Sequence, residues 1–198
     1  RCTAYVFTSP SPAFTSDAQA ASYQAAGFEI GVHLNTGCAD YTSNSLSTFF
    51  TQQVNQFRAL YPSVTAQTTH RMHCIAWDGY TLLPEVGLKY GIRLDTSFYY
   101  WPGSWVADRP GLFTGSGMPM RFATTNGSLI DVYQATTQMT DESDQSFPYT
   151  MDALLDRALG PEGYYGAFVA NMHTDIAVVP EGDETLTSAL SRGVPIIS

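Results

Sequence analysis

Four histidines are the residues of this chain best suited to chemistry, and each follows a stretch typical of a β-strand. His33 ends the segment Gly-Phe-Glu-Ile-Gly-Val-His, His70 and His73 lie three residues apart, and His173 follows Asn-Met. In a protein of alternating strands and helices, the carboxyl ends of the strands meet in one cleft, where active sites are assembled. A neutral imidazole can bind a metal ion or transfer a proton near neutral pH. The sequence therefore predicts a site built from strand ends.

Composition limits the classes of function. The chain has 198 residues, 44% of them hydrophobic, which is enough for one domain with a substantial core. Its net charge of −9 argues against nucleic acid as a partner, because phosphate backbones require clustered lysine and arginine. No stretch of about 18 apolar residues is present, so we expect no membrane span. A polar, weakly charged surface is typical of a secreted protein that handles neutral glycans.

Strand and helix patterns alternate along the chain, which predicts an α/β fold with a parallel sheet, either open or closed into a barrel. Residues 96–119 are rich in Gly, Pro, Trp and Tyr and predict a long, ordered loop. We expect a single domain over 1–198, with sequence missing at both ends because the chain starts and stops within strand-like segments. The expected strands are 3–7, 29–34, 64–70, 92–95, 120–123, 128–133, 165–172 and 194–197, and the expected helices are 17–27, 45–61, 81–90, 150–159 and 183–191, with Asp17 and Thr150 as N-caps.

Three cysteines leave one unpaired. Cys38 and Cys74 each follow a histidine-bearing strand end, so their loops could meet across one cleft. We prefer a Cys38–Cys74 disulfide over free thiols or metal thiolates, with Cys2 as the odd residue. A disulfide is consistent with an extracellular protein.

The segment Gly27-Phe-Glu-Ile-Gly-Val-His33 closely resembles the Gly-His-Glu-Ile-Gly-Asn-His segment of polysaccharide deacetylases, the NodB-homology domains of carbohydrate esterase family four. Further pieces are similar to that family in the same order. Arg71 stands where the family has its Arg-Pro-Pro motif, Gly91-Ile-Arg-Leu-Asp-Thr-Ser looks like its aspartate-bearing strand end, and Met172-His173-Thr174-Asp175 resembles its final His-Asp motif. The resemblance spans most of the chain and implies a distorted, incomplete (β/α) barrel.

The resemblance also implies roles for these residues. His33 is expected to bind a divalent metal, zinc in the first place, with cobalt, nickel or manganese as alternatives. Arg71 is expected to orient a catalytic aspartate, His173 to act as general acid, and Asp95 to pair with His173 and keep it protonated. The sugar rings of a glycan are expected to stack on Tyr99, Tyr100, Trp101 and Trp105.

Two departures from the family pattern concern the metal. The family motif Thr-Phe-Asp-Asp-Gly, which supplies a base and a metal ligand, has no counterpart, and we expect it upstream of Arg1. The second metal histidine normally falls four residues after the first, where this chain has Gly37. His73, or less readily His70, could supply the missing imidazole from the next strand end, because neighbouring strands lie about 5 Å apart.

Simpler interpretations exist for each residue. His33 and His73 could be structural histidines, Arg71 a buried ion-pair partner, and Asp95 and Asp175 helix caps. The acidic run Asp141–Asp144 resembles a calcium loop but is more typical of a solvated one. The function that these observations favour is metal-dependent removal of acetyl groups from an N- or O-acetylated polysaccharide. The alternative is a carbohydrate-binding pseudoenzyme that kept the barrel and lost the complete metal site.

Overall fold

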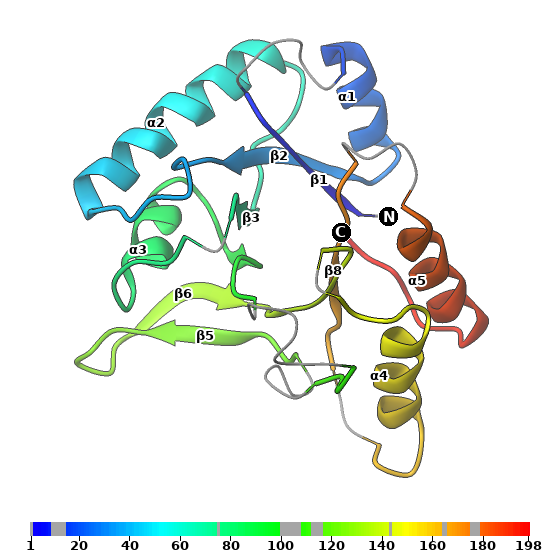
Figure 1. The fold of residues 1–198 in the computed structure, drawn as a ribbon. Coiled ribbons are helices and arrows are strands. Elements are labelled where there is room, and N and C mark those ends of the chain that lie inside the picture. Colours follow the sequence, from blue (N-terminus) through cyan, green and yellow to red (C-terminus); the bar gives the residue numbers. More distant parts are fainter. Residues whose placement is uncertain are drawn as a thin grey trace. The chain divides into compact units, whose positions relative to one another are not determined.

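The computed structural model describes residues 2–8, 15–74, 76–99, 108–111, 117–142, 144–163, 166–174 and 179–198. These residues form two compact units, each with its own sheet and helices (Figure 1). The first comprises Arg1–Ser97, Met120–Gln134 and Ile197–Ser198, and the second Phe98–Pro119 and Ala135–Ile196. None of the described helices has the length and hydropathy needed to cross a membrane.

The first unit contains a six-stranded sheet in the order β1-β2-β3-β4-β6-β5. Its pairs are parallel except for β5 and β6, which form the antiparallel hairpin that the turn at Thr-Asn-Gly predicts. This confirms a mixed α/β fold with parallel strands, whereas closure into a barrel stays a prediction. The strands are β1 (Thr3–Val6), β2 (Glu29–Leu34), β3 (Thr69–Met72), β4 (Leu94–Asp95), β5 (Met120–Ala123) and β6 (Leu129–Gln134).

Three helices belong to this unit, α1 (Asp17–Ala25), α2 (Ser43–Leu60) and α3 (Leu82–Lys89). The expected N-cap at Asp17 is wrong by one residue, because Ser16 caps α1 in a reciprocal capping box with Gln19. Helix α2 begins before its first apolar residue for the same reason, since Thr42 forms a capping box with Ser45. Polar caps therefore start both helices earlier than the hydrophobic periodicity indicates.

The alternation of strand β2 divides the sheet into an apolar and a polar face. Ile30, Val32 and Leu34 are buried and pack on the helix side, in two clusters with residues of α1, α2 and α3. Successive side chains of a strand point to opposite faces, so Glu29 and His33 lie on the other side of the sheet. The core of the unit thus fixes which way the histidine points.

Strand β3 begins at Thr69 rather than at the expected residue 64. Gln67, which is almost fully buried, places its side-chain amide where strand pairing would otherwise run. Its Oε1 accepts a hydrogen bond from the Val32 amide (2.5 Å), and its Nε2 donates to the Thr69 carbonyl (3.0 Å). Gly31 leaves room for this side chain, because a Cβ atom there would lie 2.9 Å from it. The side chain replaces backbone pairing, and the ladder starts two residues later.

The second unit contains the parallel pair β7 (Thr137–Thr140) and β8 (Val169–Asn171), with helices α4 (Tyr149–Leu159) and α5 (Pro180–Ser191). Strand β7 was not expected, and β8 is shorter than the predicted 165–172. No strand occurs at 194–197, where Val194 and Ile196 instead pack against the helix cluster. Helix α4 begins at Tyr149, so Thr150 lies inside it and is not its cap. The buried cluster consists of Met139, Met151, Leu154, Leu155 and Ala189.

Replacing Gln67 with alanine should lower the free energy of unfolding by about 1–3 kcal/mol, because the buried Val32 amide loses its partner. Urea denaturation of the variant and the wild type measures the difference. Gln52→Ala, an exposed glutamine of α2, is the matched control and should change stability little. Equal effects of the two substitutions would contradict the bridging role of Gln67.

Candidate metal and acid–base sites

The carboxyl ends of β1, β2 and β3 bring three rings together in the first unit. The rings of His33 and His73 are 5.3 Å apart between centroids and nearly perpendicular. Phe7, which follows β1, lies 4.9 Å from the His33 ring and 5.0 Å from the His73 ring. The parallel register that places Val6 beside Val32 accounts for this arrangement, since Phe7 and His33 are the next residues along their strands. The predicted proximity of His33 and His73 is therefore present.

His70 points away from this pair, to the helix face of the sheet. Its ring packs against Phe50 at 5.3 Å, and its Nδ1 lies 2.9 Å from the carboxylate of Asp95. His70 is inside β3, whereas His73 follows the last residue of the strand, so strand alternation governs only the first of them. Of the two candidates for a second imidazole, His73 is the one beside His33.

The surroundings of His33 prepare it as a neutral ligand. Partial burial is the main cause that lowers the pKa of His33 from its ordinary 6.5 to about 3. Its Nδ1 lies 3.0 Å from the backbone carbonyl of Arg71, and only a protonated Nδ1 can donate to that oxygen. This hydrogen bond fixes the tautomer and leaves the lone pair on Nε2, as in histidines that bind metals. Arg71 contributes its backbone to His33, while its guanidinium donates to the Thr96 carbonyl at 2.8 Å.

Asp95 does not have the partner that the sequence suggested. It is buried on the helix face, where its carboxylate accepts hydrogen bonds from His70, from the Ser97 amide (3.0 Å) and from the Ser97 hydroxyl (2.9 Å). The register of β3 and β4 explains the first contact, because it sets His70 directly beside Asp95. Within its own unit Asp95 thus pairs with His70, and the expected pairing of Asp95 with His173 stays a prediction. A catalytic role for Asp95 or Arg71 stays a prediction.

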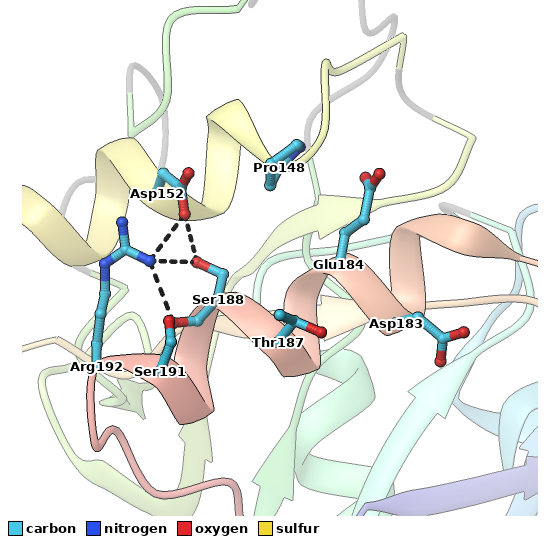
Figure 2. Close-up of a pocket in the computed structure, with 8 residues that line it drawn as sticks. All are labelled: Pro148, Asp152, Asp183, Glu184, Thr187, Ser188, Ser191 and Arg192. Atoms are coloured by element: carbon cyan, nitrogen blue, oxygen red, sulfur yellow. Dashed lines mark hydrogen bonds and ion pairs between the residues drawn. The ribbon is translucent and has the colours of Figure 1, made fainter.

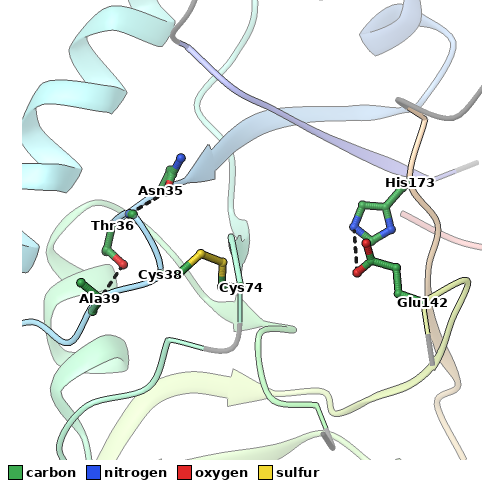
Figure 3. Close-up of a disulfide and its surroundings, with 8 residues drawn as sticks. Asn35, Thr36, Cys38, Ala39, Cys74, Glu142 and His173 are labelled. Carbon is green, nitrogen blue, oxygen red and sulfur yellow. Dashed lines mark hydrogen bonds and ion pairs between the residues drawn. A yellow bond between two sulfur atoms is a disulfide. The ribbon is translucent and has the colours of Figure 1, made fainter. Parts of the chain in front are cut away.

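His173 has carboxylate partners within the second unit. Asp141 accepts a hydrogen bond from the His173 backbone amide (2.8 Å), and its other oxygen lies 2.7 Å from the ring Nδ1. Glu142 lies 3.6 Å from Nε2 on the far side of the ring (Figure 3). Asp141 is 5% exposed and His173 is 32% exposed, so the dyad has a buried carboxylate and an accessible imidazole. This arrangement suits an imidazole that transfers protons at Nε2.

Asp141 is a functional candidate that the sequence analysis considered only as part of the acidic run Asp141–Asp144, and not as a partner of His173. It directly follows β7, and His173 follows β8, which is parallel to β7 in the same sheet. The strand-end rule that selected the histidines would have selected Asp141 too, but β7 was not recognised. Its four residues, Thr-Gln-Met-Thr, are buried without forming an apolar run.

The end of β1 is the place nearest His33 where a carboxylate ligand could stand. Phe7 and Thr8 occupy it, and the sequence between Cys2 and Asp17 contains no acidic residue. The strand paired with β2 on this side is β1, and the expectation of an aspartate pair upstream of Arg1 stays a prediction. Among the described residues, the two imidazoles lie side by side here without the carboxylate of a complete family site.

Cys38 and Cys74 form the predicted disulfide, with their Cα atoms 5.5 Å apart (Figure 3). Both cysteines have positive φ angles, 59° and 61°, a region that residues with side chains seldom adopt. Hydrogen bonds from the Gly37 amide to the Asn35 side chain (2.7 Å) and from the Thr36 hydroxyl to the Ala39 carbonyl (3.1 Å) hold the loop of Cys38. The bridge joins the loops after β2 and β3 beside His73.

The aromatic residues proposed as a sugar platform are only partly described. Tyr99 is buried, with 8% exposure, which does not suit an open stacking surface. Tyr100, Trp101 and Trp105 lie outside the described residues. Glycan stacking by these residues stays a prediction.

A pocket of about 350 Å³ lies between helices α4 and α5 of the second unit, and no predicted site residue lines it (Figure 2). Arg192 reaches across it and donates hydrogen bonds to Ser188 (2.9 Å) and to Asp156 (2.9 Å), and it lies 2.9 Å from Asp152. These contacts join the two helices. They account for Arg192 and Asp152 of the pocket as parts of a helix–helix connection.

Comparison with known proteins adds little to this geometry. Neither a known protein-family model nor a curated protein sequence matches the chain. The chain is similar to the crystal structure of a Bordetella bronchiseptica protein provisionally named a polysaccharide deacetylase involved in O-antigen biosynthesis, with 18% sequence identity and a TM-score of 0.41. The similarity covers 74% of this chain and 50% of that one, so the chain spans about half the length of that protein. A similarity at this level establishes no shared activity.

The depressed pKa of His33 predicts how stability changes with pH. Between about pH 6.5 and about pH 3, His33 binds a proton in the unfolded chain but not in the folded protein. The contribution of His33 to the free energy of unfolding is therefore fully present above pH 6.5 and is lost as the pH falls toward 3. Denaturation of chelator-treated wild type and His33→Gln across this range tests it. The variant should lose less stability on acidification, and identical pH profiles would contradict the neutral state of His33.

Loss of the disulfide should destabilise the protein by about 2–4 kcal/mol, because the bridge constrains the unfolded chain. The measurement is denaturant unfolding of Cys38→Ser in a Cys2→Ser background. Cys2→Ser alone removes the exposed free thiol and serves as the control that should retain wild-type stability.

Proposed function

We propose that this protein is a metal-dependent hydrolase that removes acetyl groups from an N- or O-acetylated polysaccharide outside the cell. The observation that carries the proposal is the pair of imidazoles at neighbouring strand ends, His33 and His73, of which His33 is neutral with its Nε2 lone pair free of the Arg71 hydrogen bond. Four motifs in the family order support the reaction class. The disulfide supports an oxidising compartment.

His33 and His73 would hold the metal, zinc in the first place. A bound divalent metal polarises the acyl oxygen and makes water a better nucleophile near neutral pH. The Arg71 carbonyl keeps His33 in the tautomer that binding requires, and Phe7 covers both rings on one side. These residues would position the acetyl group and exclude bulk water.

The family resemblance gives His173 the role of general acid in the same reaction. Protonated His173 would give the proton on Nε2 to the departing amine or alcohol, which otherwise leaves as a poor, charged group. Asp141 would stabilise the imidazolium through Nδ1 and hold the ring in place with its second oxygen on the backbone amide. Asp141 is thus a positioning residue for His173.

Metal content is the first test. Elemental mass spectrometry of the wild type should find a divalent transition metal, zinc above all, that is lost in His33→Ala and in His73→Ala. Gln52→Ala is the control that should retain it. Absence of metal after reloading in wild type and variants alike would overturn metal dependence.

Acetate release from acetylated chitooligosaccharides and from acetylated xylan tests the reaction. Metal-loaded wild type should release acetate, and His173→Ala should reduce kcat by about 10²–10⁴-fold, the usual contribution of a general acid. Asp141→Asn should lower kcat with little change in KM, since Asp141 touches His173 rather than substrate.

A carbohydrate-binding protein without catalysis is the second candidate, and the aromatic residue at the end of β1 favours it. Phe7 is 42% exposed and occupies the strand end where a carboxylate ligand could stand. The metal-loaded protein would then bind these glycans without releasing acetate, and His33→Ala would bind them with unchanged affinity. That pair of results would select this candidate over the enzyme.

A further inference from the structure

The strongest unassigned group of ligands is centred on His73. The sulfur atoms of Cys38 and Cys74 and a ring nitrogen of His73 all lie within 4.8 Å of one another, the one such group of three that the described part of the chain contains. The His33 ring lies 5.3 Å from the His73 ring, between centroids. Two sulfurs and two imidazoles are the ligand set of a closed zinc site.

We propose that reduction of the Cys38–Cys74 disulfide converts this cluster into a zinc–thiolate site formed by Cys38, Cys74 and His73, with His33 as the fourth ligand. The disulfide and this centre are alternative states of the same two sulfur atoms. The inference adds a second metal-binding mode to the protein and does not require that it hydrolyse any acetyl group.

The geometry is close to what zinc needs. Zinc–sulfur bonds of about 2.3 Å and zinc–nitrogen bonds of about 2.0–2.1 Å put the ligand atoms of a tetrahedral site about 3.3–3.8 Å apart. The ring nitrogen of His73 lies within 4.8 Å of both sulfurs, so it must approach them by about 1 Å. The two sulfurs must separate by about 1.7 Å once their bond is broken. Both cysteines are in surface loops after strand ends, where such shifts require no change in the core. The Arg71 carbonyl holds His33 through Nδ1, which leaves Nε2 as the atom that can bind zinc.

The reaction balances with an external dithiol as reductant. The dithiol gives two electrons and two protons to the Cys38–Cys74 bond, which breaks to two thiols while the reductant becomes a disulfide. Binding of Zn²⁺ then displaces the two thiol protons to solvent, because the thiolate is the ligand form. Reoxidation would release the zinc and restore the bridge.

Reduction of the disulfide would also affect the proposed hydrolysis, and this consequence alone rests on the proposed function. In the oxidised protein a metal on His33 and His73 retains open positions for water and substrate. A site closed by two thiolates and two imidazoles has none. Reduction would therefore bind zinc more tightly and at the same time block its use in catalysis.

Cobalt binding to reduced Cys2→Ser protein tests the proposal without any substrate. Thiolate ligation gives a sulfur-to-cobalt charge-transfer band in the near ultraviolet. We expect one equivalent of cobalt to produce this band in the reduced protein, none in the oxidised protein, and loss of the band in Cys38→Ser and Cys74→Ser. His33→Ala should keep the band and weaken cobalt affinity.

A second readout protects the test against variants that fold poorly. In the reduced Cys2→Ser protein, zinc should slow the reaction of the two thiols with a chromogenic disulfide reagent by about tenfold or more, since the thiolates are then metal ligands. Circular dichroism monitors folding throughout. The proposal would be overturned by equal thiol reactivity with and without zinc or by the absence of a charge-transfer band. It would also be overturned if the reduced chain is unfolded and zinc does not refold it. Each of these outcomes is independent of the acetate assay of the oxidised protein.

Discussion

The alternation of strand β2 is the constraint on which the rest of the first unit depends. Ile30, Val32 and Leu34 must enter the helix-covered face, because their burial provides the contacts that hold α1 and α2 to the sheet. The side chains of the intervening residues must then point to the opposite face, and His33 is one of these residues. A shift of one residue in the pairing of β2 would bury the imidazole and expose the core, so the stability of the unit and the direction of the His33 side chain come from the same pattern.

The strand-end argument predicted the proximity of His33 and His73 and the Cys38–Cys74 bridge well, because it depends on topology alone. Parallel strands bring their carboxyl ends to one edge whatever their exact bounds, so the adjacency of His33 and His73 and the Cys38–Cys74 bridge did not require correct element limits. The argument failed where burial was polar. Strand β7 is buried through Thr, Gln and Met side chains, so it has no hydrophobic pattern, and the strand-end position of Asp141 was therefore missed. The side chain of Gln67 likewise replaces strand pairing, which no periodicity reveals.

Three of the histidines show how differently one strand-end motif can be used. His70 is buried against Phe50, and its hydrogen bond to Asp95 lies inside the sheet, where it joins β3 to β4. His173 has the same type of partner, Asp141, but keeps a third of its side chain exposed. His33 has a backbone carbonyl as its partner and stays neutral. A carboxylate beside an accessible ring favours proton transfer, a carbonyl beside a neutral ring favours metal binding, and a carboxylate beside a buried ring is structural.

The charge of the available ligands distinguishes the two metal-binding states that we propose. Two neutral imidazoles leave the full charge of a divalent cation uncompensated, which strengthens its pull on an acyl oxygen but lowers the affinity with which the protein holds it. A carboxylate at the end of β1 would raise the affinity for the metal and keep part of its pull on the acyl oxygen. This chain has Phe7 at that position instead. The only anionic donors that its described loops can place beside His73 are the sulfurs of Cys38 and Cys74, and those exist as thiolates only when the bridge is open. In the proposed site, affinity and reactivity toward metal would be separated into two redox states, because the bond that stabilises the loops also withholds the ligands that would bind zinc most tightly.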